Sequence, residues 1–111
     1  MAGSIASTAV IGAAVELPAD AVVGDFCILG VDRGGAAEGA RTVLGDGATI
    51  RSHTVIYAGN RIGARFQTGH QVLIREENVI GDDVSIDSHT VIEHHLTIAD
   101  GVRIHSHAFI P

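Results

Sequence analysis

The sequence contains few aromatic residues, one cysteine and two prolines. Its 111 residues include three Phe, one Tyr and no Trp, so a wide core built around large rings is not expected. A single cysteine excludes an internal disulfide framework and suits a reducing compartment. Although aromatic residues are few, 46% of the chain is hydrophobic. This composition favours a narrow core of Ile, Val and Leu.

Clusters of positive charge and long apolar runs are also missing. Lys and Arg number 7 against 13 Asp and Glu, which gives a formal net charge of −6. We therefore expect no nucleic-acid partner and no anionic membrane partner. The sequence shows no signal peptide, and no apolar run approaches the roughly 18 residues of a membrane span. A cytoplasmic location is predicted.

An aliphatic residue returns at every sixth position along most of the chain. A helix repeats at about 3.6 residues and a strand at two, so this period requires a unit that turns every six residues. We call the unit a hexad and count it from its aliphatic residue. The fifth position is mostly small or apolar, and the second is often Gly. The aliphatic series is Ile5, Ile11, Leu17, Val23 and Leu29, then Leu44, Ile50, Ile56, Ile62, Ile74, Ile80, Ile86, Ile92, Ile98, Ile104 and Ile110, with Thr68 breaking the second series.

Three hexads make a triangular coil of 18 residues. Stacked coils would pair strand on strand at about 4.8 Å, with the aliphatic side chains along the axis. This pattern resembles the hexapeptide-repeat parallel β-helix. Known members wind left-handed, and the resemblance, rather than the spacing, implies that hand here. We predict an all-β fold, a left-handed parallel β-helix of about six coils.

We predict a single domain over residues 1–111 with one insertion. Residues 30–43 are rich in Gly and Ala and lack the period, so we expect a loop that leaves the second coil, where binding residues commonly lie. Pro111 directly follows the inward Ile110, without a helix or a polar cap. Because an exposed coil end carries unpaired backbone groups, we expect the chain to lack C-terminal coils or a cap.

Three inward fifth positions hold residues that could be mistaken for a site. Cys27 is predicted to be buried filler rather than a reactive thiol. Asn60 and Asn78 lie in adjacent coils, and their amides can hydrogen-bond as a ladder. We interpret all three as structural.

Residues 18 apart lie above one another in such a coil, so the corners can be derived by counting. The second corner holds Ser52-His53, His70-Gln71, Ser88-His89 and Ser106-His107, and the third holds Ala58-Gly59, Glu76-Glu77 and His94-His95. Six of the seven histidines therefore lie at corners. One explanation is conformational, since the fourth hexad position often needs a positive φ, which Gly, Asn, Asp and His tolerate. The other explanation is chemical.

The segment with His89 and His94 resembles the hexapeptide-repeat acyltransferases. In the UDP-N-acetylglucosamine O-acyltransferases, the related N-acyltransferases and the bacterial nucleotide-sugar N-acetyltransferases, the general-base histidine stands in an aliphatic-x-His hexad, which is similar to residues 92–94. In the galactoside acetyltransferases it is the fourth residue of an I-G-S-H-V-V hexad, which is similar to residues 86–91 with Asp in place of the Gly. The first group often places an acidic residue after the histidine, whereas this chain has His95.

The resemblance implies an enzyme that moves an acetyl or acyl group from a CoA or carrier-protein thioester to an amino or hydroxyl group of a sugar, most closely a sugar nucleotide. Acetyl-CoA or another acyl-CoA would be the co-substrate, and no metal is expected. Histidine suits the general base because it titrates near neutral pH. His94 is the first candidate and His89 the second. Glu76 or Glu77, one coil away, could orient the imidazole of His94.

The outward strand positions differ between two faces. One column reads Val55, Leu73, Val91 and Phe109, and the preceding face reads Thr49, Gln67, Ser85 and Arg103. An apolar stripe on a rod usually marks a subunit contact. The resemblance implies a homotrimer, with acyl-donor and acceptor sites in the grooves between subunits.

Two other functions stay open. The γ-class carbonic anhydrases share this fold and bind zinc through histidines of two subunits, and the ligands here would be His70, His89 and His94. In that family the first histidine of the H-x4-H pair occupies the third hexad position, whereas His89 occupies the fourth. The chain could also be a structural or oligomerising rod without chemistry of its own.

Overall fold

A computed structural model describes residues 3–32, 37 and 39–111. The described residues form 17 short strands and no helix, and most strands are two residues long because the chain turns in every hexad. Sheet A contains β1 (Ser4–Ile5), β4 (Val22–Val23), β7 (Thr49–Ile50), β10 (Gln67–Thr68), β13 (Ser85–Ile86) and β16 (Arg103–Ile104). Sheet B contains β2 (Val10–Ile11), β5 (Ile28–Val31), β8 (Val55–Tyr57), β11 (Leu73–Ile74), β14 (Val91–Ile92) and β17 (Phe109–Ile110). Sheet C contains β3 (Val15–Glu16), β6 (Thr42–Leu44), β9 (Arg61–Ile62), β12 (Val79–Ile80) and β15 (Thr97–Ile98).

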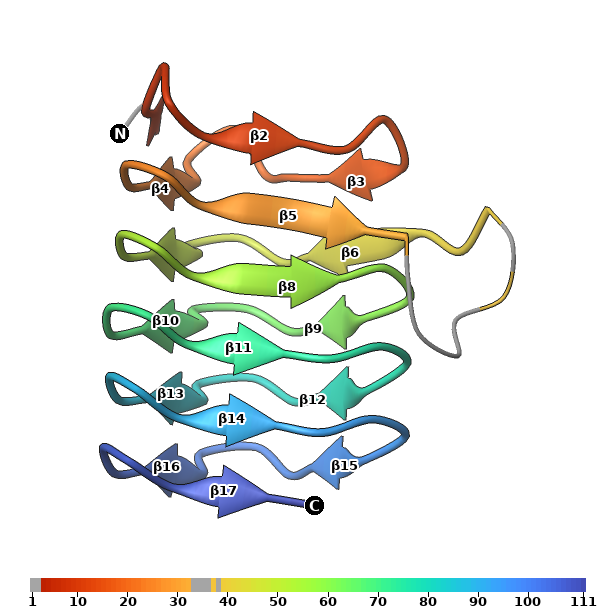
Figure 1. Cartoon of the computed structure of the whole chain (residues 1–111), viewed down its shortest axis with the longest axis vertical. Coiled ribbons are helices and arrows are strands. Elements are labelled where there is room, and N and C mark those ends of the chain that lie inside the picture. The colour runs from red at the N-terminus through yellow and green to blue at the C-terminus, as the bar shows by residue number, and fades with distance from the viewer. Residues whose placement is uncertain (1–2, 33–36, 38) are drawn as a thin grey trace.

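All strand pairs within the three sheets are parallel, and the coils stack into a β-solenoid (Figure 1). The strands of sheet B run left to right on the near side of Figure 1, and the chain returns behind them as it descends from the N-terminus. Seen from the N-terminal end, the chain therefore turns anticlockwise while it recedes, which makes the coil left-handed. The predicted fold class is confirmed.

The register shows where the predicted insertion lies. Gln67 pairs with Ser85, 18 residues further on, but Val22 pairs with Thr49, 27 residues further on. The coil between them therefore holds extra chain, which leaves the rod between β5 and β6, at the third corner. The expected loop over 30–43 is too long, because β5 continues to Val31 and β6 begins at Thr42. Residues 33–36 and 38 of that loop lie outside the described part of the chain.

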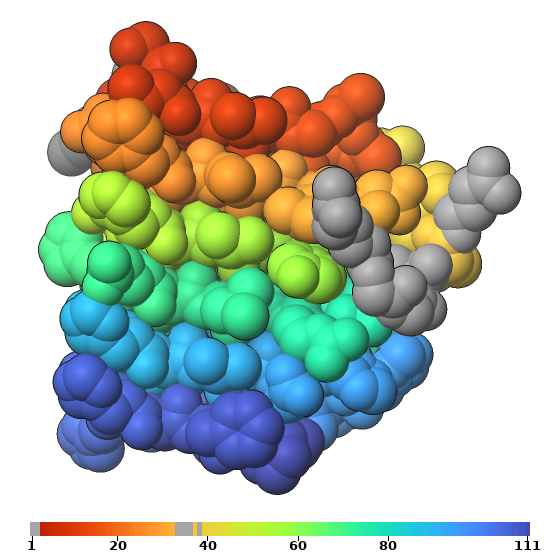
Figure 2. All heavy atoms as spheres, viewed as in Figure 1, coloured from red at the N-terminus to blue at the C-terminus, as the bar shows by residue number. Residues whose placement is uncertain are grey.

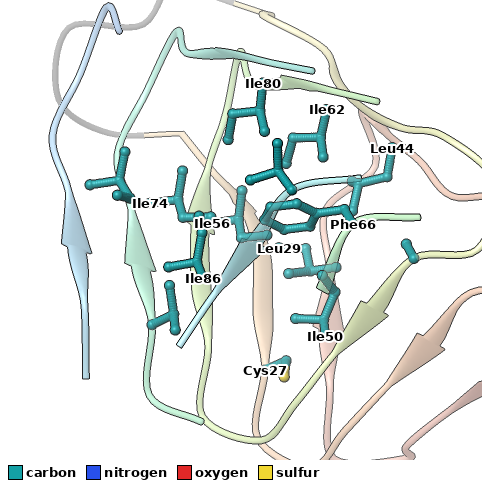
Figure 3. Close-up of a cluster of buried hydrophobic side chains, with 14 of the residues drawn as sticks. Cys27, Leu29, Leu44, Ile50, Ile56, Ile62, Phe66, Ile74, Ile80 and Ile86 are labelled. Carbon is teal, nitrogen blue, oxygen red and sulfur yellow. The ribbon is translucent and has the colours of Figure 1, made fainter. Parts of the chain in front are cut away.

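The axis of the solenoid is filled by the inward first and fifth hexad positions (Figure 3). The largest buried side chain is Phe66, which has no exposed surface and lies among aliphatic side chains in Figure 3. Each buried Ile, Val or Leu contributes roughly 1.5–3 kcal/mol through loss of water contact. The fully buried aliphatic side chains include Leu29, Ile50, Ile56, Ile74, Ile86 and Ile92.

The corners are built from left-handed residues, as the sequence predicts. From Gly47 to His107, every fourth hexad position has a positive φ, between 57° and 85°. A residue with this φ bends the chain sharply, so the next strand begins within two residues. Most of these positions do not hold Gly, so they carry conformational strain. The residues are Gly47, His53, Gly59, Arg65, Gln71, Glu77, Asp83, His89, His95, Gly101 and His107.

Gln71→Gly is expected to stabilise the fold by about 0.5–1 kcal/mol, because glycine relieves the left-handed strain at φ 57° while losing more chain entropy. Chemical denaturation measures this change. The matched control is Gln67→Gly in β10, where the same replacement in a strand should lower stability. A Gln71→Gly protein less stable than the wild type would contradict the role assigned to these corners.

The structural role predicted for Asn60 and Asn78 is confirmed, but the ladder runs through the backbone, because the side-chain amides bond main-chain groups and not each other. Asn60 donates from Nδ2 to the carbonyl oxygens of Tyr57 and Arg75, at 2.8 and 2.6 Å, and accepts at Oδ1 from the backbone N–H of Asn78, at 3.2 Å. Asn78 repeats the pattern one coil later, and both side chains are fully buried. The amides thus satisfy backbone groups that the third corner turns towards the core.

Asn78→Ala is expected to lower the free energy of unfolding by about 2–3 kcal/mol. The replacement leaves the carbonyl oxygens of Arg75 and Glu93 and the N–H of Leu96 without their side-chain partner in a buried place. Denaturation of the variant beside Thr97→Ala, an exposed strand position, measures the effect. A loss below about 1 kcal/mol would mean that the ladder is not needed.

Cys27 is buried filler, as predicted. It has no exposed surface, and its Sγ lies 3.1 Å from the carbonyl oxygen of Arg51. Burial raises the pKa of the thiol, so the reactive thiolate is disfavoured.

None of the elements in the described ranges is a helix that could cross a membrane.

Candidate functional site

The third corner brings the predicted base His94 into contact with His95, which the sequence analysis did not assign to the site. His94 and His95 are both exposed, and their Nδ1 atoms lie 2.8 Å apart with the rings nearly perpendicular, at 88°. A hydrogen bond between two Nδ1 atoms requires one ring to donate and the other to accept. The donating ring then keeps a free lone pair on Nε2, and the accepting ring carries its proton on Nε2. The pair therefore presents one base and one proton donor to solvent.

The structure separates the two glutamates that the sequence treats as equivalent. Glu76, one coil before His94, is 1% exposed, and its carboxylate lies against the guanidinium of Arg75, with Oε1 3.3 Å from Nε. Arg75 also reaches Glu93, at 3.4 Å between Nη1 and Oε1. The backbone N–H of His95 donates to the carbonyl oxygen of Glu76, at 3.2 Å. Glu76 thus belongs to the wall of the corner.

Glu77, one coil before His95, lines a hollow beside the third corner. The hollow has a volume of about 410 Å³ and lies on the outer side of sheet C. Its walls include Arg61 of β9 and the end of the insertion, where Arg41 makes an ion pair of 2.9 Å with Glu16. Charges of both signs therefore surround this space, which extends to Glu77, one coil before His95. Sequence reasoning did not name these two arginines, although the insertion pointed to this corner.

The second corner carries the other histidines on separate contacts. His89 stacks on His107, with ring centroids 5.0 Å apart and planes within 7°. His70 lies 2.8 Å from the hydroxyl of Ser52, measured from Nδ1 to Oγ. His53 packs against Phe26, with centroids 5.2 Å apart. His89 and His94 therefore belong to different corners, with strand β14 between them.

Residues 79–111 match the family described as the bacterial transferase hexapeptide (six repeats). Together with the β-solenoid, this match shows that the chain carries the hexapeptide repeat. The matched segment contains His89, His94 and His95, and the resemblance seen in the sequence is confirmed at the level of the superfamily. A search of curated proteins found no significant match.

This hexapeptide-repeat protein does not gather the three histidines of the zinc alternative. Within the described ranges, no group of three or more His, Cys, Asp and Glu side chains is arranged to hold a metal ion. His70, His89 and His94 each make a different contact, with Ser52, His107 and His95.

The outer face of sheet B carries an apolar stripe that extends beyond the predicted column from Val55 to Phe109. Its pairing continues from Val55 back to Ile28 and Val10, which are 39% and 59% exposed. At the other end lies Phe109, which is 60% exposed. Figure 2 views the hexapeptide-repeat protein from this side. The second and third corners, with their histidines, border this face.

The outer face of sheet A is polar and hollowed. Two adjoining depressions of 490 and 260 Å³ share Gln67, Ser85 and Arg103 in their walls. Arg51 lies in the smaller one, where its Nη1 donates to the carbonyl oxygen of Thr68 at 2.8 Å. The polar and apolar faces predicted from the outward columns are therefore both present.

Proposed function

We propose that this hexapeptide-repeat protein is an acyltransferase with its reaction centre at the third corner. The observation that carries the proposal is the exposed His94–His95 pair, which lies within the segment that matches the transferase hexapeptide family and one coil from Glu77, a residue that lines the 410 Å³ hollow. An acyl transfer needs a base near an open space for the acceptor, and this corner supplies both. His89, stacked on His107 at the other corner, is the less favoured candidate.

His94 acts as the general base in this proposal. With its Nδ1–H donated to Nδ1 of His95, its Nε2 carries the lone pair that takes the proton from the acceptor's amino or hydroxyl group. The acceptor oxygen or nitrogen then attacks the thioester carbonyl, and the proton returns to the leaving thiolate. His95 keeps His94 in one tautomer, which is the role that a carboxylate has in many histidine-based sites.

The two glutamates take different parts in the proposal. Glu76 holds the corner in place through Arg75, because its buried carboxylate lies against that guanidinium. Glu77 lines the hollow and would contact the acceptor, together with Arg61. A sugar suits such walls, since carboxylates accept and guanidiniums donate hydrogen bonds to hydroxyl groups.

The substrates follow from the resemblance. Acetyl-CoA or another acyl-CoA is the proposed donor, with a carrier-protein thioester as the other source, and a sugar nucleotide is the proposed acceptor. The apolar face of sheet B supports a homotrimer, because exposed apolar faces usually mark contacts between subunits. A cytoplasmic location suits the buried free thiol of Cys27.

Release of free CoA from acetyl-CoA, followed with a thiol reagent over a panel of amino- and hydroxyl-bearing sugar nucleotides, tests the proposal. Turnover that depends on an acceptor, with mass spectrometry of the acylated product, is the expected result. Absence of thermal stabilisation by acetyl-CoA together with absence of turnover across the panel would favour a structural rod instead.

A further inference from the structure

The second corner presents two parallel imidazoles on the surface of the last two coils. His89 and His107 are both exposed and stack with centroids 5.0 Å apart and planes within 7°. We propose that these two side chains form a chelating site for a divalent transition-metal ion such as Zn²⁺, Ni²⁺ or Cu²⁺. The site is separate from the third corner and does not depend on acyl transfer.

The backbone holds the two side chains in matching orientations. Both residues have a φ of 62°, and each donates its N–H to the coil before it, His89 to the carbonyl oxygen of His70 at 3.0 Å and His107 to that of Ser88 at 3.1 Å. The Cα–Cβ bonds of His89 and His107 therefore point in the same direction from two stacked turns. Little backbone freedom remains to be lost when both rings bind one ion, which favours chelation.

The ring nitrogens of this pair are also available. In the described part of the chain, neither ring takes part in a hydrogen bond or an ion pair. The other histidines near these corners are engaged: His70 with Ser52, and His94 with His95. A metal can therefore bind His89 and His107 without breaking an existing polar contact.

The spacing suits a small ion after a modest side-chain movement. Metal–nitrogen bonds of about 2.1 Å place two nitrogens on one ion roughly 3–3.4 Å apart. Exposed rings with centroids at 5.0 Å can tilt their edges towards each other to reach that separation. Imidazole is a ligand that Zn²⁺, Ni²⁺ and Cu²⁺ accept, with Cu²⁺ bound most tightly. Because no third side chain joins the pair within the described ranges, water completes the coordination and the ion exchanges with solvent.

Titration of the untagged full chain with Zn²⁺ and Cu²⁺ by calorimetry tests the site, with His89→Gln and His107→Gln as variants. Glutamine is suitable because the chain itself has Gln71 at the same corner position, one coil before His89, with a φ of 57°. We expect one ion per chain and at least about a tenfold loss of affinity in each variant, since a lone imidazole loses the intramolecular second bond. Electron paramagnetic resonance of the Cu²⁺ complex should show two coupled nitrogens, and one in either variant.

His53→Gln is the matched control, because His53 has a φ of 63° at the same corner position but packs against Phe26, with the ring planes tilted by 36°. It should leave metal affinity unchanged, and so should His94→Gln. Unchanged affinity in the His89→Gln/His107→Gln double variant would overturn the proposal. An equal loss in His53→Gln would also overturn it, by showing that surface histidines bind the ion without selection.

Discussion

His94→Ala is expected to lower acyl transfer by about 10²–10⁴-fold in kcat while leaving the fold intact. The size of the loss is typical for removal of a general base, because no positioned side chain then takes the proton from the substrate's amino or hydroxyl group. The side chain is exposed, so its removal creates no cavity in the solenoid. Steady-state kinetics with the best acceptor of the panel measure the change, and circular dichroism monitors the fold.

Two variants locate the effect. His95→Ala should give an intermediate loss, because His94 keeps its ring but loses the Nδ1 partner at 2.8 Å. His53→Ala removes an exposed histidine of the second corner and should leave kcat unchanged. If His94→Ala kept a rate within about threefold of the wild type, the base would have to be sought elsewhere, and His89→Ala would be the next variant.

Phe66→Ala is expected to destabilise the protein by about 3–5 kcal/mol. The ring is the largest of the fully buried side chains and lies on an axis only a few side chains wide. Its removal takes away both the transfer free energy of the ring and the contacts of the surrounding side chains, and a stack of rigid strand pairs can close the resulting cavity only slightly. Urea denaturation measures the change, and Phe66→Leu should recover a large part of it.

Phe109→Ala provides the matched control for Phe66→Ala. The Phe109 ring is 60% exposed on the outer face of sheet B, so its truncation in a monomer should cost less than about 1 kcal/mol. A similar loss in both variants would mean that the axis is not where the stability resides. A large effect of Phe109→Ala confined to oligomeric protein would support the sheet B face as a subunit contact.

The fold was predictable because each link from sequence to structure is local. A six-residue period sets the strands, the 18-residue sum sets their register, and the pairing of Gln67 with Ser85 and of Leu73 with Val91 follows directly. The insertion was less predictable at its edges. Thr42 fills an inward position without surface exposure, so the strand begins before the aliphatic series resumes at Leu44.

The site was predictable in position but not in contacts. Counting coils placed Glu76 and Glu77 next to His94, yet it could not show that Glu76 is 1% exposed against Arg75 while Glu77 lines a hollow. The His94–His95 contact also depends on side-chain rotamers. Rotamers are chosen by neighbours above and below in the stack, and a linear pattern does not contain them.

The sequence by itself determined the left-handed corner residues, the asparagine ladder and the two contrasting faces, because each follows from which residues recur at a fixed interval. Counting placed His89 and His107 one coil apart, but only the tertiary structure decided that their rings stack and that His94 and His95 meet through Nδ1. His89 lies on His107 and His94 on His95, although all four occupy similar corners, because the stacking of coils brings the first pair together across 18 residues and the turn brings the second together within one. That difference gives the two corners separate chemistry: a base at one and a metal-binding pair at the other in our proposals.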